Sequence, residues 1–493
     1  MSRLGRARAP SHVMLPLAAA AWLALSATIP AQATTLLQLS SDPYTNTNSQ
    51  HRTELEPDTF AFGSTIVSTF QVGRFFSGGA SNIGFATSTN GGASWTAGSL
   101  PGSTTFATPP GIYARASDPT VAFDARHNAW LISYLGLWPN GNTAEVDVLV
   151  SRSIDGGLTW SNPVTVAATG DFFDKNWTVC DDTSTSPFYG NYYTEFDDVN
   201  FNDLEQMSTS IDGGLTWGAA LTTGNKDHGI GGQPLVQPTG TVIVPFNSFR
   251  GQGFTISAFE STDGGGSWSS SVNVAPVHFH HAAGGIRDSI PLPSAEMDGS
   301  GKVYVVWQDC RFEKKCAASD LLLSTSTDGL TWPDPVRIPV DPVGSGVDHF
   351  FPAIAVDRST SGSSTHIVLT YYFYPNTACT ASTCQLDVGD TSSTNGGATW
   401  AAGTQIAGPM SLSWLPSTSQ GTMVGDYFSV SFAAGVAYPA IAVASARFNG
   451  VFNEAIFTVV GGLAAAGGSL PTGGGASGNS TTEAATTSSV TDQ

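Results

Sequence analysis

A short glycine-rich segment that ends in tryptophan recurs six times along this chain of 493 residues. Each copy reads Ser, a variable residue, Asp or Asn, one or two Gly, another variable residue, Ser or Thr, and Trp. The copies occupy residues 88–95, 153–160, 210–217, 261–268, 326–332 and 393–400, and their starts lie 51 to 67 residues apart. Such a repeat is typical of solenoids and propellers, in which each repeat is one supersecondary unit. We call these segments the Trp turns.

The residue types in the Trp turns predict a tight turn with an anchor. The Asp or Asn side chain accepts hydrogen bonds from backbone N–H groups two or three residues further on. Gly-Gly supplies backbone conformations with positive φ at no steric cost. The Trp ring is bulky enough to fasten the turn against the body of the protein. We therefore assign these six Asp and Asn residues a structural role and no catalytic one.

The Trp turns resemble the Asp-box repeat, Ser-x-Asp-x-Gly-x-x-Trp, of sialidases and related β-propellers. Five copies match at full length, with Asn for Asp in two of them, and together the copies span residues 88–400. The resemblance implies an all-β, sialidase-like β-propeller. It also implies that each Trp turn lies between the third and fourth strands of a blade, on the face away from the ligand site.

The number of blades is predicted from a second pattern. A polar segment followed by strand-like runs precedes each Trp turn, and a seventh such segment, Gly425-Asp426-Tyr427, has no Trp turn after it. Three strand candidates follow it, at 428–433, 439–444 and 454–460, and an N-terminal run at 35–40 has no partner of its own. Joining the four closes the ring and removes an exposed edge. This favours seven blades within residues 34–460, whereas six blades, the usual number in sialidases, would leave part of 428–460 outside.

The two ends of the chain are set apart from this domain. Three arginines (Arg3, Arg6 and Arg8), an apolar stretch at 15–29 and the small residues of Ala31-Gln32-Ala33 are typical of a signal peptide. Residues 1–33 therefore predict secretion, to the extracellular space or the periplasm. Residues 461–493 are rich in Gly, Ala, Ser and Thr, which predicts a disordered tail.

Cysteine spacing agrees with an oxidising compartment. Cys310 and Cys316 are six residues apart, and Cys379 and Cys384 are five apart, so each pair can close a small loop as a disulfide. Cys180 is left over. Neither spacing fits Cys-x-x-Cys, and no His stands close by, so we predict no metal site on these cysteines.

Charge excludes two classes of partner. The chain has 19 Lys and Arg against 39 Asp and Glu, a net charge of −20, and only 12% of its residues are charged. A general nucleic-acid binder needs clustered cations to neutralise phosphates, and an anionic membrane surface attracts basic segments. We expect a monomer that binds a glycan and has neither nucleic acid nor membrane as a partner.

Candidate site residues follow from the topology of a blade. The loop before the first strand and the loop after the second open on the same face, opposite the Trp turns. The candidate catalytic residues are Asp118, Asp288, Asp426 and Tyr427, because each acidic segment there has an Arg or a Tyr beside it. The candidate substrate-binding residues are Arg74, Arg115, Arg250, Arg287 and Arg311. Paired carboxylates suit glycoside hydrolysis, and guanidinium groups suit carboxylate or sulfate. Alternatively, the Asp residues fix turns and the Arg residues pair with carboxylates at the rim.

These observations favour a secreted, sialidase-like glycoside hydrolase that acts on an acidic glycan. The alternative is a non-catalytic extracellular propeller that binds a glycan or a protein. Sialidases use a Tyr nucleophile assisted by Glu, an Asp acid/base and three Arg. Only these residue types match, because the early Arg-Ile-Pro signature of sialidases is missing where residues 54–70 lie.

We predict no cofactor, with one candidate cation site. Residues 197–205 (Asp-Asp-Val-Asn-Phe-Asn-Asp-Leu-Glu) alternate oxygen-bearing side chains in a way that suits calcium. The segment lacks the Gly and the spacing of an EF-hand loop, so a solvated loop is the other interpretation.

Overall fold

A computed structural model describes residues 1, 34–138, 145–249, 253–288 and 290–472 of the chain. The predicted signal peptide (from residue 2), Arg250 and residues 473–493 lie outside the described residues. The fold of the described part is all-β, with short 3₁₀ turns between strands. These turns are η1 (Val199–Phe201), η2 (Ala283–Gly285), η3 (Lys314–Cys316), η4 (Gly362–Ser364) and η5 (Leu412–Trp414).

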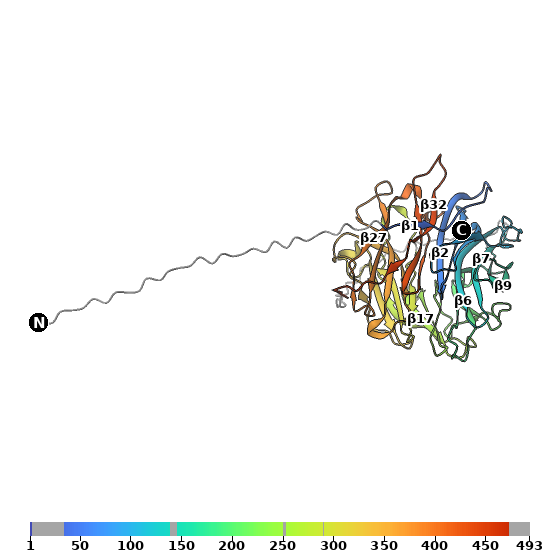
Figure 1. The fold of residues 1–493 in the computed structure, drawn as a ribbon, viewed down its shortest axis with the longest axis horizontal. Coiled ribbons are helices and arrows are strands. Elements are labelled where there is room, and N and C mark those ends of the chain that lie inside the picture. The colour runs from blue at the N-terminus through green and yellow to red at the C-terminus, as the bar shows by residue number, and fades with distance from the viewer. Residues whose placement is uncertain (2–33, 139–144, 250–252, 289, 473–493) are drawn as a thin grey trace. The chain divides into compact units, whose positions relative to one another are not determined.

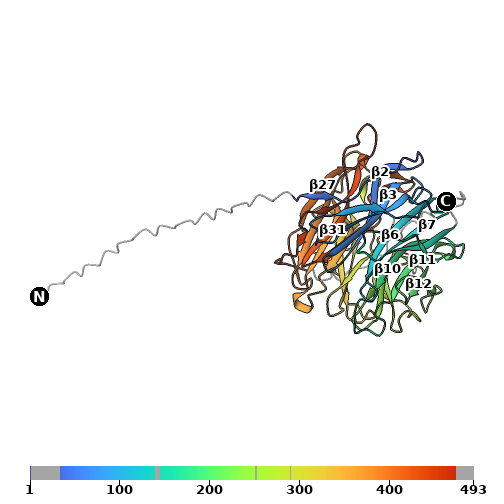
Figure 2. The same ribbon diagram turned by 45° about the vertical axis from the view of Figure 1, so that its right-hand side comes forward.

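Most strands belong to antiparallel groups of four, or of five in the fourth group, that follow one another along the chain (Figures 1 and 2). The first group contains β2 (Gln50–Phe62), β3 (Thr65–Arg74), β4 (Ala80–Ser88) and β5 (Thr96–Ser99). The second contains β6 (Arg115–Asp124), β7 (Ala129–Leu137), β8 (Val146–Ser153) and β9 (Val164–Ala167). The third contains β10 (Phe173–Cys180), β11 (Tyr192–Asp198), β12 (Leu204–Ser210) and β13 (Leu221–Thr222). The fourth group contains β14 (Gly229–Ile230) and β15 (Leu235–Val236), which both pair with β16 (Val242–Ser248), and then β17 (Thr255–Ser261) and β18 (Val272–Pro276). The fifth contains β19 (Ser294–Met297), β20 (Val303–Asp309), β21 (Asp320–Ser326) and β22 (Val336–Arg337). The sixth contains β23 (Asp348–Val356), β24 (Ile367–Tyr374), β25 (Gln385–Ser393) and β27 (Thr404–Ser411).

The last group joins the two ends of the described chain. It contains β30 (Ser429–Ala433), β31 (Val436–Ala444) and β32 (Glu454–Val459), and the N-terminal β1 (Leu36–Gln38) pairs antiparallel with β32. Figure 1 shows the red β32 beside the blue β1 and β2. Single bridges, Thr53 to Glu454 and Ala80 to Ala116, continue the pairing into the first and second groups.

Ordered structure continues beyond residue 460, which corrects the predicted tail. β33 (Leu463–Ala464) pairs with β31, and β34 (Leu470–Pro471) pairs with β26 (Thr399–Trp400). The Gly content that predicted disorder permits a close approach here, because a Cβ on Gly468 would lie 1.7 Å from the carbonyl oxygen of Trp400. A further short hairpin, β28 (Ser417–Thr418) and β29 (Gly421–Thr422), follows η5.

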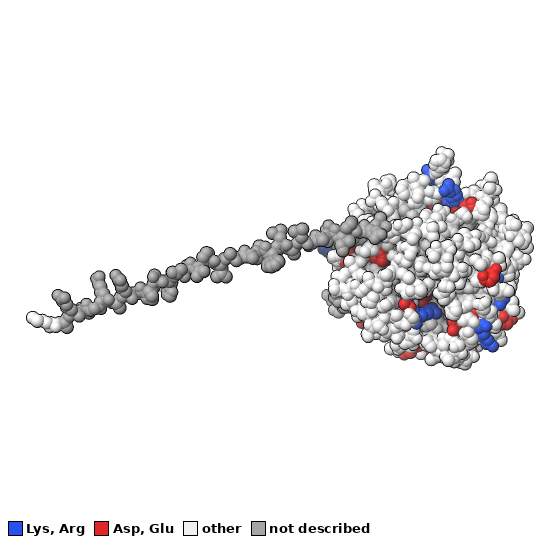
Figure 3. Space-filling view, in the orientation of Figure 1, with Lys and Arg blue, Asp and Glu red and all other residues white. Residues whose placement is uncertain are grey.

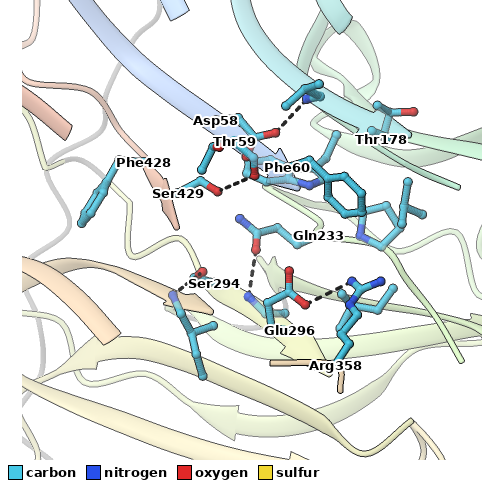
Figure 4. Close-up of a pocket in the computed structure, with 18 residues that line it drawn as sticks. Asp58, Thr59, Phe60, Thr178, Gln233, Ser294, Glu296, Arg358, Phe428 and Ser429 are labelled. Carbon is cyan, nitrogen blue, oxygen red and sulfur yellow. Dashed lines mark hydrogen bonds and ion pairs between the residues drawn. The ribbon is translucent and has the colours of Figure 1, made fainter. Parts of the chain in front are cut away.

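The first strands of the groups lie side by side around a small cavity. β2, β6, β10, β15, β19, β23 and β30 contact one another in this order, and β30 contacts β2. Their side chains leave a cavity of only about 40 Å³ (Figure 4). Hydrogen bonds link neighbouring groups there: the N–H of Val121 donates to Asp58 (2.7 Å) and that of Ala295 to Gln233 (2.8 Å). Side chains therefore fill most of the space between the first strands, and hydrogen bonds connect neighbouring groups there.

The second Trp turn has the predicted construction, although the N–H donors lie three and four residues after the Asp. In this turn, Asp155 Oδ1 accepts hydrogen bonds from the N–H groups of Leu158 (3.1 Å) and Thr159 (2.9 Å), and Trp160 Nε1 donates to the carbonyl of Gly157 (3.2 Å). Burial opposes ionisation of Asp155, but the Thr159 hydroxyl and these N–H groups lower its pKa to about 2. The prediction of a structural role for this Asp is confirmed.

Disulfides and surface charge also follow the sequence. The disulfides Cys310–Cys316 and Cys379–Cys384 are confirmed, and Cys180 is a buried free thiol. The face shown in Figure 3 carries only scattered charged side chains. No helix within the described residues is both long and apolar enough to cross a membrane.

Candidate functional site

A pocket of about 280 Å³ lies at the strand ends that face away from the Trp turns. Its lining includes Leu137, at the end of β7, and Val146, at the start of β8, which are paired with each other. The Trp turn of this group begins at Ser153, which pairs with Trp130 at the other end of the same two strands. For this group, the predicted separation of candidate site and Trp turn is confirmed.

Charged side chains from several groups converge on this pocket, which is otherwise largely apolar. Those that line it are Glu56, Arg74, Asp118, Asp174, Lys175, Arg287 and Asp426. Three cations therefore meet four carboxyl groups in one cavity. Apolar side chains such as Phe172, Ile230 and Leu292 complete the lining.

β-Bulges in the first strands position three of these residues. Glu56 in β2, Asp118 in β6 and Lys175 in β10 have positive φ angles (51°, 48° and 50°), and each lies where its strand shifts register against the next. A bulge re-aims a side chain, and strained non-glycine residues of this kind cluster at functional sites. Pro57 and Pro119 follow two of them; proline is tolerated at a bulge, where no ladder hydrogen bond is lost.

Two ion pairs and one cation–aromatic contact organise the charges. Lys175 Nζ lies 3.4 Å from Asp118 Oδ2 and 3.8 Å from the ring centroid of Tyr427. Arg287 Nη2 lies 2.6 Å from Asp426 Oδ2. These contacts connect side chains from β6, β10, the β18–β19 loop and the segment before β30.

Glu56 and Arg74 are joined through a glutamine. The amide nitrogen of Gln71 donates to the Glu56 carboxyl, and Arg74 Nη1 donates to the amide oxygen of Gln71 (2.9 Å). All three side chains are buried. Gln71 therefore fixes the guanidinium and the carboxyl relative to each other.

Burial and charge push the pKa values of the pocket carboxyls apart. Burial, and then the charge of Asp118, raise the pKa of Glu56 to about 8 and that of Asp174 to about 7. Burial alone would also raise the pKa of Asp118, but the Lys175 ammonium and a hydrogen bond from Ser117 hold it below its usual value. At neutral pH the pocket thus contains a protonated Glu56 near an ionised Asp118. Such a split is how a site assigns a proton donor and a carboxylate base.

The structure brings four of the predicted site residues together and sets two others at the margin. Arg74, Asp118, Arg287 and Asp426 line the pocket. The Tyr427 hydroxyl donates to the carbonyl of Pro119 (3.1 Å), and burial raises its pKa well above the usual value. Arg115 is held at the edge, where its Nη1 donates to Ser77 (2.9 Å) and to the carbonyl of Gly78 (2.9 Å).

Two predicted residues point elsewhere. Asp288 contacts His281 (Oδ1 to Nδ1, 3.2 Å) and not the pocket. Arg311 forms an ion pair with Asp309 (2.7 Å), which is the alternative of a rim salt bridge. Arg287 and Asp288 are neighbours in an irregular loop, but the Arg287 side chain pairs with Asp426 in the pocket, whereas the Asp288 side chain contacts His281.

Three pocket residues, Glu56, Asp174 and Lys175, were not among the predicted site residues. They belong to two of the polar segments that precede the Trp turns, at residues 56–58 and 174–176, but their convergence depends on the bulges. An acidic residue directly before Pro inside a run of strand-forming residues, as in Glu56-Pro57 and Asp118-Pro119, is the signal in the sequence for such a bulge.

The candidate calcium segment forms a hairpin turn. Asp197 and Glu205 are paired across β11 and β12 and are buried in the sheet, whereas Asp198 caps η1 by accepting the N–H of Asn200 (3.1 Å). The oxygen-bearing side chains therefore divide between the sheet and the turn.

Two sets of side chains among the described residues have metal-ligand atoms within 4.8 Å of one another. They are Asp124, Cys180 and Asp182, and Asp320, Asp341 and His349. In the second set Arg337 already pairs with both carboxylates, and in the first Asp124 accepts the backbone N–H groups of the turn after β6. Neither set lines the pocket.

No protein-family model matches the sequence, and no curated protein matches it in sequence. Among solved structures, a PL25 ulvan lyase is 10% identical over 87% of this chain and 96% of its own, with a TM-score of 0.52. The Hadza microbial sialidase Hz136 is 13% identical over 87% and 92%, with a TM-score of 0.44. The α-L-arabinofuranosidase Arb93A from Fusarium graminearum is 13% identical over 72% and 97%, with a TM-score of 0.44. The chain therefore shares the fold of the ulvan lyase.

Proposed function

We propose that the chain is a secreted seven-bladed β-propeller in which each of the seven groups of strands is one blade. The order in which the first strands contact one another supports this, since β30 returns to β2. The pairing of β1 with β32 gives the last group its fourth strand and would close the ring. Two disulfides support an extracellular location, to which residues 1–33 would direct the chain as a signal peptide.

We propose further that this propeller is a glycan-active enzyme that takes an acidic sugar residue in the pocket. The observation that carries the proposal is the meeting of a protonated Glu56, an ionised Asp118 and three cations in one cavity. Glu56 would donate a proton to the leaving oxygen, and Asp118 would act as base or nucleophile on the sugar.

Charge balance favours an anionic substrate. With Glu56 protonated, Arg74, Lys175 and Arg287 outnumber the carboxylates Asp118 and Asp426, and Asp174 is close to half-ionised at neutral pH. A carboxylate or sulfate on the sugar would complete the neutralisation, with Arg74 and Arg287 as its donors. The ulvan lyase that shares the fold is bound to -[GlcA(1-4)Rha3S]-, a glycan with an acidic sugar.

Tyr427 would support Lys175 in this proposal and would not attack the substrate. Its hydroxyl already donates a hydrogen bond to the carbonyl of Pro119, and its ring contacts the Lys175 ammonium. The enzyme would then differ from sialidases in the group that carries the chemistry, although it binds an acidic sugar at the same face of a propeller.

One observation favours the second function, a non-catalytic glycan-binding propeller. Lys175 and Arg287 already have carboxylate partners, so part of the charge is neutralised without a substrate. That function predicts glycan retention on an array that survives loss of Asp118, Asp288 and Tyr427.

The deciding experiment is a product screen of the mature protein on uronic-acid glycans and sialosides, with detection of both hydrolysis and unsaturated elimination products. Glu56→Gln and Asp118→Asn should each lower kcat/KM by roughly 10²- to 10⁴-fold, whereas the exposed control Asp334→Asn should leave it unchanged. Activity should fall as the pH rises through about 8, because Glu56 then loses its proton. Absence of product from every acidic glycan would contradict the enzyme and leave the binding function.

A further inference from the structure

Two buried polar side chains connect Glu56, the proposed proton donor, with Asp118, the proposed base or nucleophile. Gln71 lies in β3, and Ser117 lies in β6 directly before Asp118. Gln71 is completely buried and does not line the pocket, whereas Ser117 is 7% exposed and does. Gln71 can therefore influence a substrate only through the side chains that it contacts.

Arg74 settles which way the Gln71 amide points. A guanidinium group can only donate hydrogen bonds, and Arg74 Nη1 lies 2.9 Å from Gln71 Oε1. The amide nitrogen is thereby directed the other way, where it donates to Glu56 Oε2 and to Ser117 Oγ (3.1 Å). An amide nitrogen carries two hydrogens, so each acceptor receives one of them.

These two donations fix the direction of the next hydrogen bond. The Ser117 hydroxyl accepts from Gln71, so its single hydrogen is available for another acceptor. Asp118 Oδ1 lies 2.5 Å from Ser117 Oγ, and an ionised carboxylate can only accept. Every bond from Arg74 through Gln71 and Ser117 to Asp118 therefore runs in one direction.

One oxygen of Glu56 is occupied by this network and the other is not. Oε2 accepts the hydrogen bond from Gln71, whereas the N–H of Asp426 lies 3.4 Å from Oε1. A protonated carboxyl group carries its hydrogen on one oxygen and accepts best at the other. The proton of Glu56 therefore belongs on Oε1.

The two oxygens of Asp118 are divided in the same way. Oδ1 accepts the hydrogen bond from Ser117, and Oδ2 lies 3.4 Å from Lys175 Nζ. The Lys175 ammonium has no hydrogen-bond partner among the described residues. It therefore stabilises negative charge on Oδ2, while the hydroxyl holds the carboxylate plane through Oδ1.

We propose that Gln71 and Ser117 are positioning residues that select Glu56 Oε1 as the oxygen that donates the proton and Asp118 Oδ2 as the oxygen that acts on the sugar. This inference rests on the function proposed above and adds to it which atoms react. Side chains that are held in the productive orientation before the reaction do not have to be aligned during it, and this lowers the barrier.

The chain offers a matched control for Gln71. Gln308 lies in β20, the second strand of its group, and is followed three residues later by Arg311, as Gln71 in β3 is followed by Arg74. Gln308 is also buried, and its Oε1 accepts the N–H of Phe351 (2.9 Å). It does not line the pocket. A change at Gln308 therefore alters a buried glutamine in the same setting without altering the proposed site.

Gln71→Glu tests the direction of the hydrogen bonds. The new carboxylate has nearly the same shape and still accepts from Arg74, but it cannot donate, so the proton of Glu56 should move to Oε2 to face it. We expect kcat to fall by roughly 100-fold at pH 7 with KM unchanged. The alkaline limit of activity should move upwards from about 8 by roughly one pH unit, because a neighbouring negative charge raises the pKa of Glu56. Gln308→Glu should change neither kcat nor the limit.

Ser117→Ala tests the other end of the network. The Ser117 hydroxyl helps to hold the pKa of Asp118 low, so its loss should move the acid limit of activity upwards and lower kcat by roughly 10-fold. Ser117→Thr keeps a hydroxyl and should restore both. The variants leave unchanged the other charged groups that act on Glu56 and Asp118, which are Arg74, Lys175, Arg287 and Asp426.

An NMR titration of the Glu side-chain carboxyl carbons needs no substrate and separates this inference from the proposed function. The signal of Glu56 is identified by its loss in Glu56→Gln. Its midpoint should lie near 8 in the unmutated protein and higher in Gln71→Glu. An unshifted midpoint overturns the inference even if the protein turns over no acidic glycan. Wild-type kcat and pH limits in Gln71→Glu and Ser117→Ala, in an enzyme that Glu56→Gln inactivates, would overturn the positioning roles and leave the proposed function intact.

Discussion

Two sets of buried carboxyl groups lie in adjacent groups of strands and differ in charge. Asp118, on β6 in the pocket, is held ionised. Asp197 and Glu205, on β11 and β12, are completely buried, and their pKa values are raised, to about 8 for Glu205. Glu195, two residues before Asp197, behaves like them. We call these last three residues the carboxyl row.

The difference between the two sets is a cation. Asp118 has the Lys175 ammonium at 3.4 Å. In the carboxyl row burial is the largest cause of the raised pKa values, and the charges of neighbouring carboxyls raise them further, so the protonated form is favoured. Asp174 joins the two sets, because it lines the pocket and is paired with Asp197 across the sheet. Among these buried carboxyl groups, the position of the Lys175 ammonium therefore decides which one carries a negative charge.

The largest effect on the free energy of unfolding should come from removing the Lys175 ammonium. Lys175→Met leaves Asp118 buried without its partner, which should lower the free energy of unfolding by about 3–5 kcal/mol. Urea unfolding at pH 7 measures this loss. Asp118 should then become protonated, as the carboxyl row is.

The double variant Lys175→Met/Asp118→Asn is the control for this comparison. It removes both charges, so it should recover most of the stability that the single variant loses. A single variant that costs less than about 1 kcal/mol, the range of a surface ion pair, would mean that Lys175 does not set the charge of Asp118.

The carboxyl row should respond to pH in the opposite sense from an ion-paired carboxylate. The folded-state pKa of Glu205, about 8, lies above its ordinary value of 4.5, so its contribution is complete below pH 4.5 and is lost as the pH rises towards 8. Within that window the ionisation of Glu205 therefore lowers the free energy of unfolding by about 1.4 kcal/mol for each unit that the pH rises. Glu205→Gln should reduce the slope by that amount in urea unfolding between pH 5 and 8, and Asp334→Asn should not change it.

The sequence predicts the fold more completely than the site. The Trp turns identify the repeat, because their hydrogen bonds are local and the same residue pattern recurs. The convergence of Arg74, Asp118 and Asp426 follows from blade topology. The sequence does not predict that the side chains of Glu56 and Lys175 point into the pocket, because a bulge with positive φ overrides the alternation of side chains along a strand. Asp288 does not line the pocket, and an irregular loop has no period from which to predict where its side chain points.

The smallest effect concerns a third kind of carboxylate, in the Trp turns. Asp155 is exposed, and donors in its own turn keep it ionised without a cation. Asp155→Ala should cost about 1 kcal/mol at pH 7, as the loss of a helix N-cap does. Because the folded-state pKa of Asp155 is depressed to about 2, the part of this loss that depends on charge should be complete above pH 3.8 and should vanish as the pH falls through 2. Asn90 accepts the equivalent bond from the N–H of Ser94 (2.9 Å), so Asn90→Ala should cost a similar amount with no such pH dependence. Equal pH dependence in both variants would mean that the turn responds to acid through other groups, and that local donors do not replace a cation.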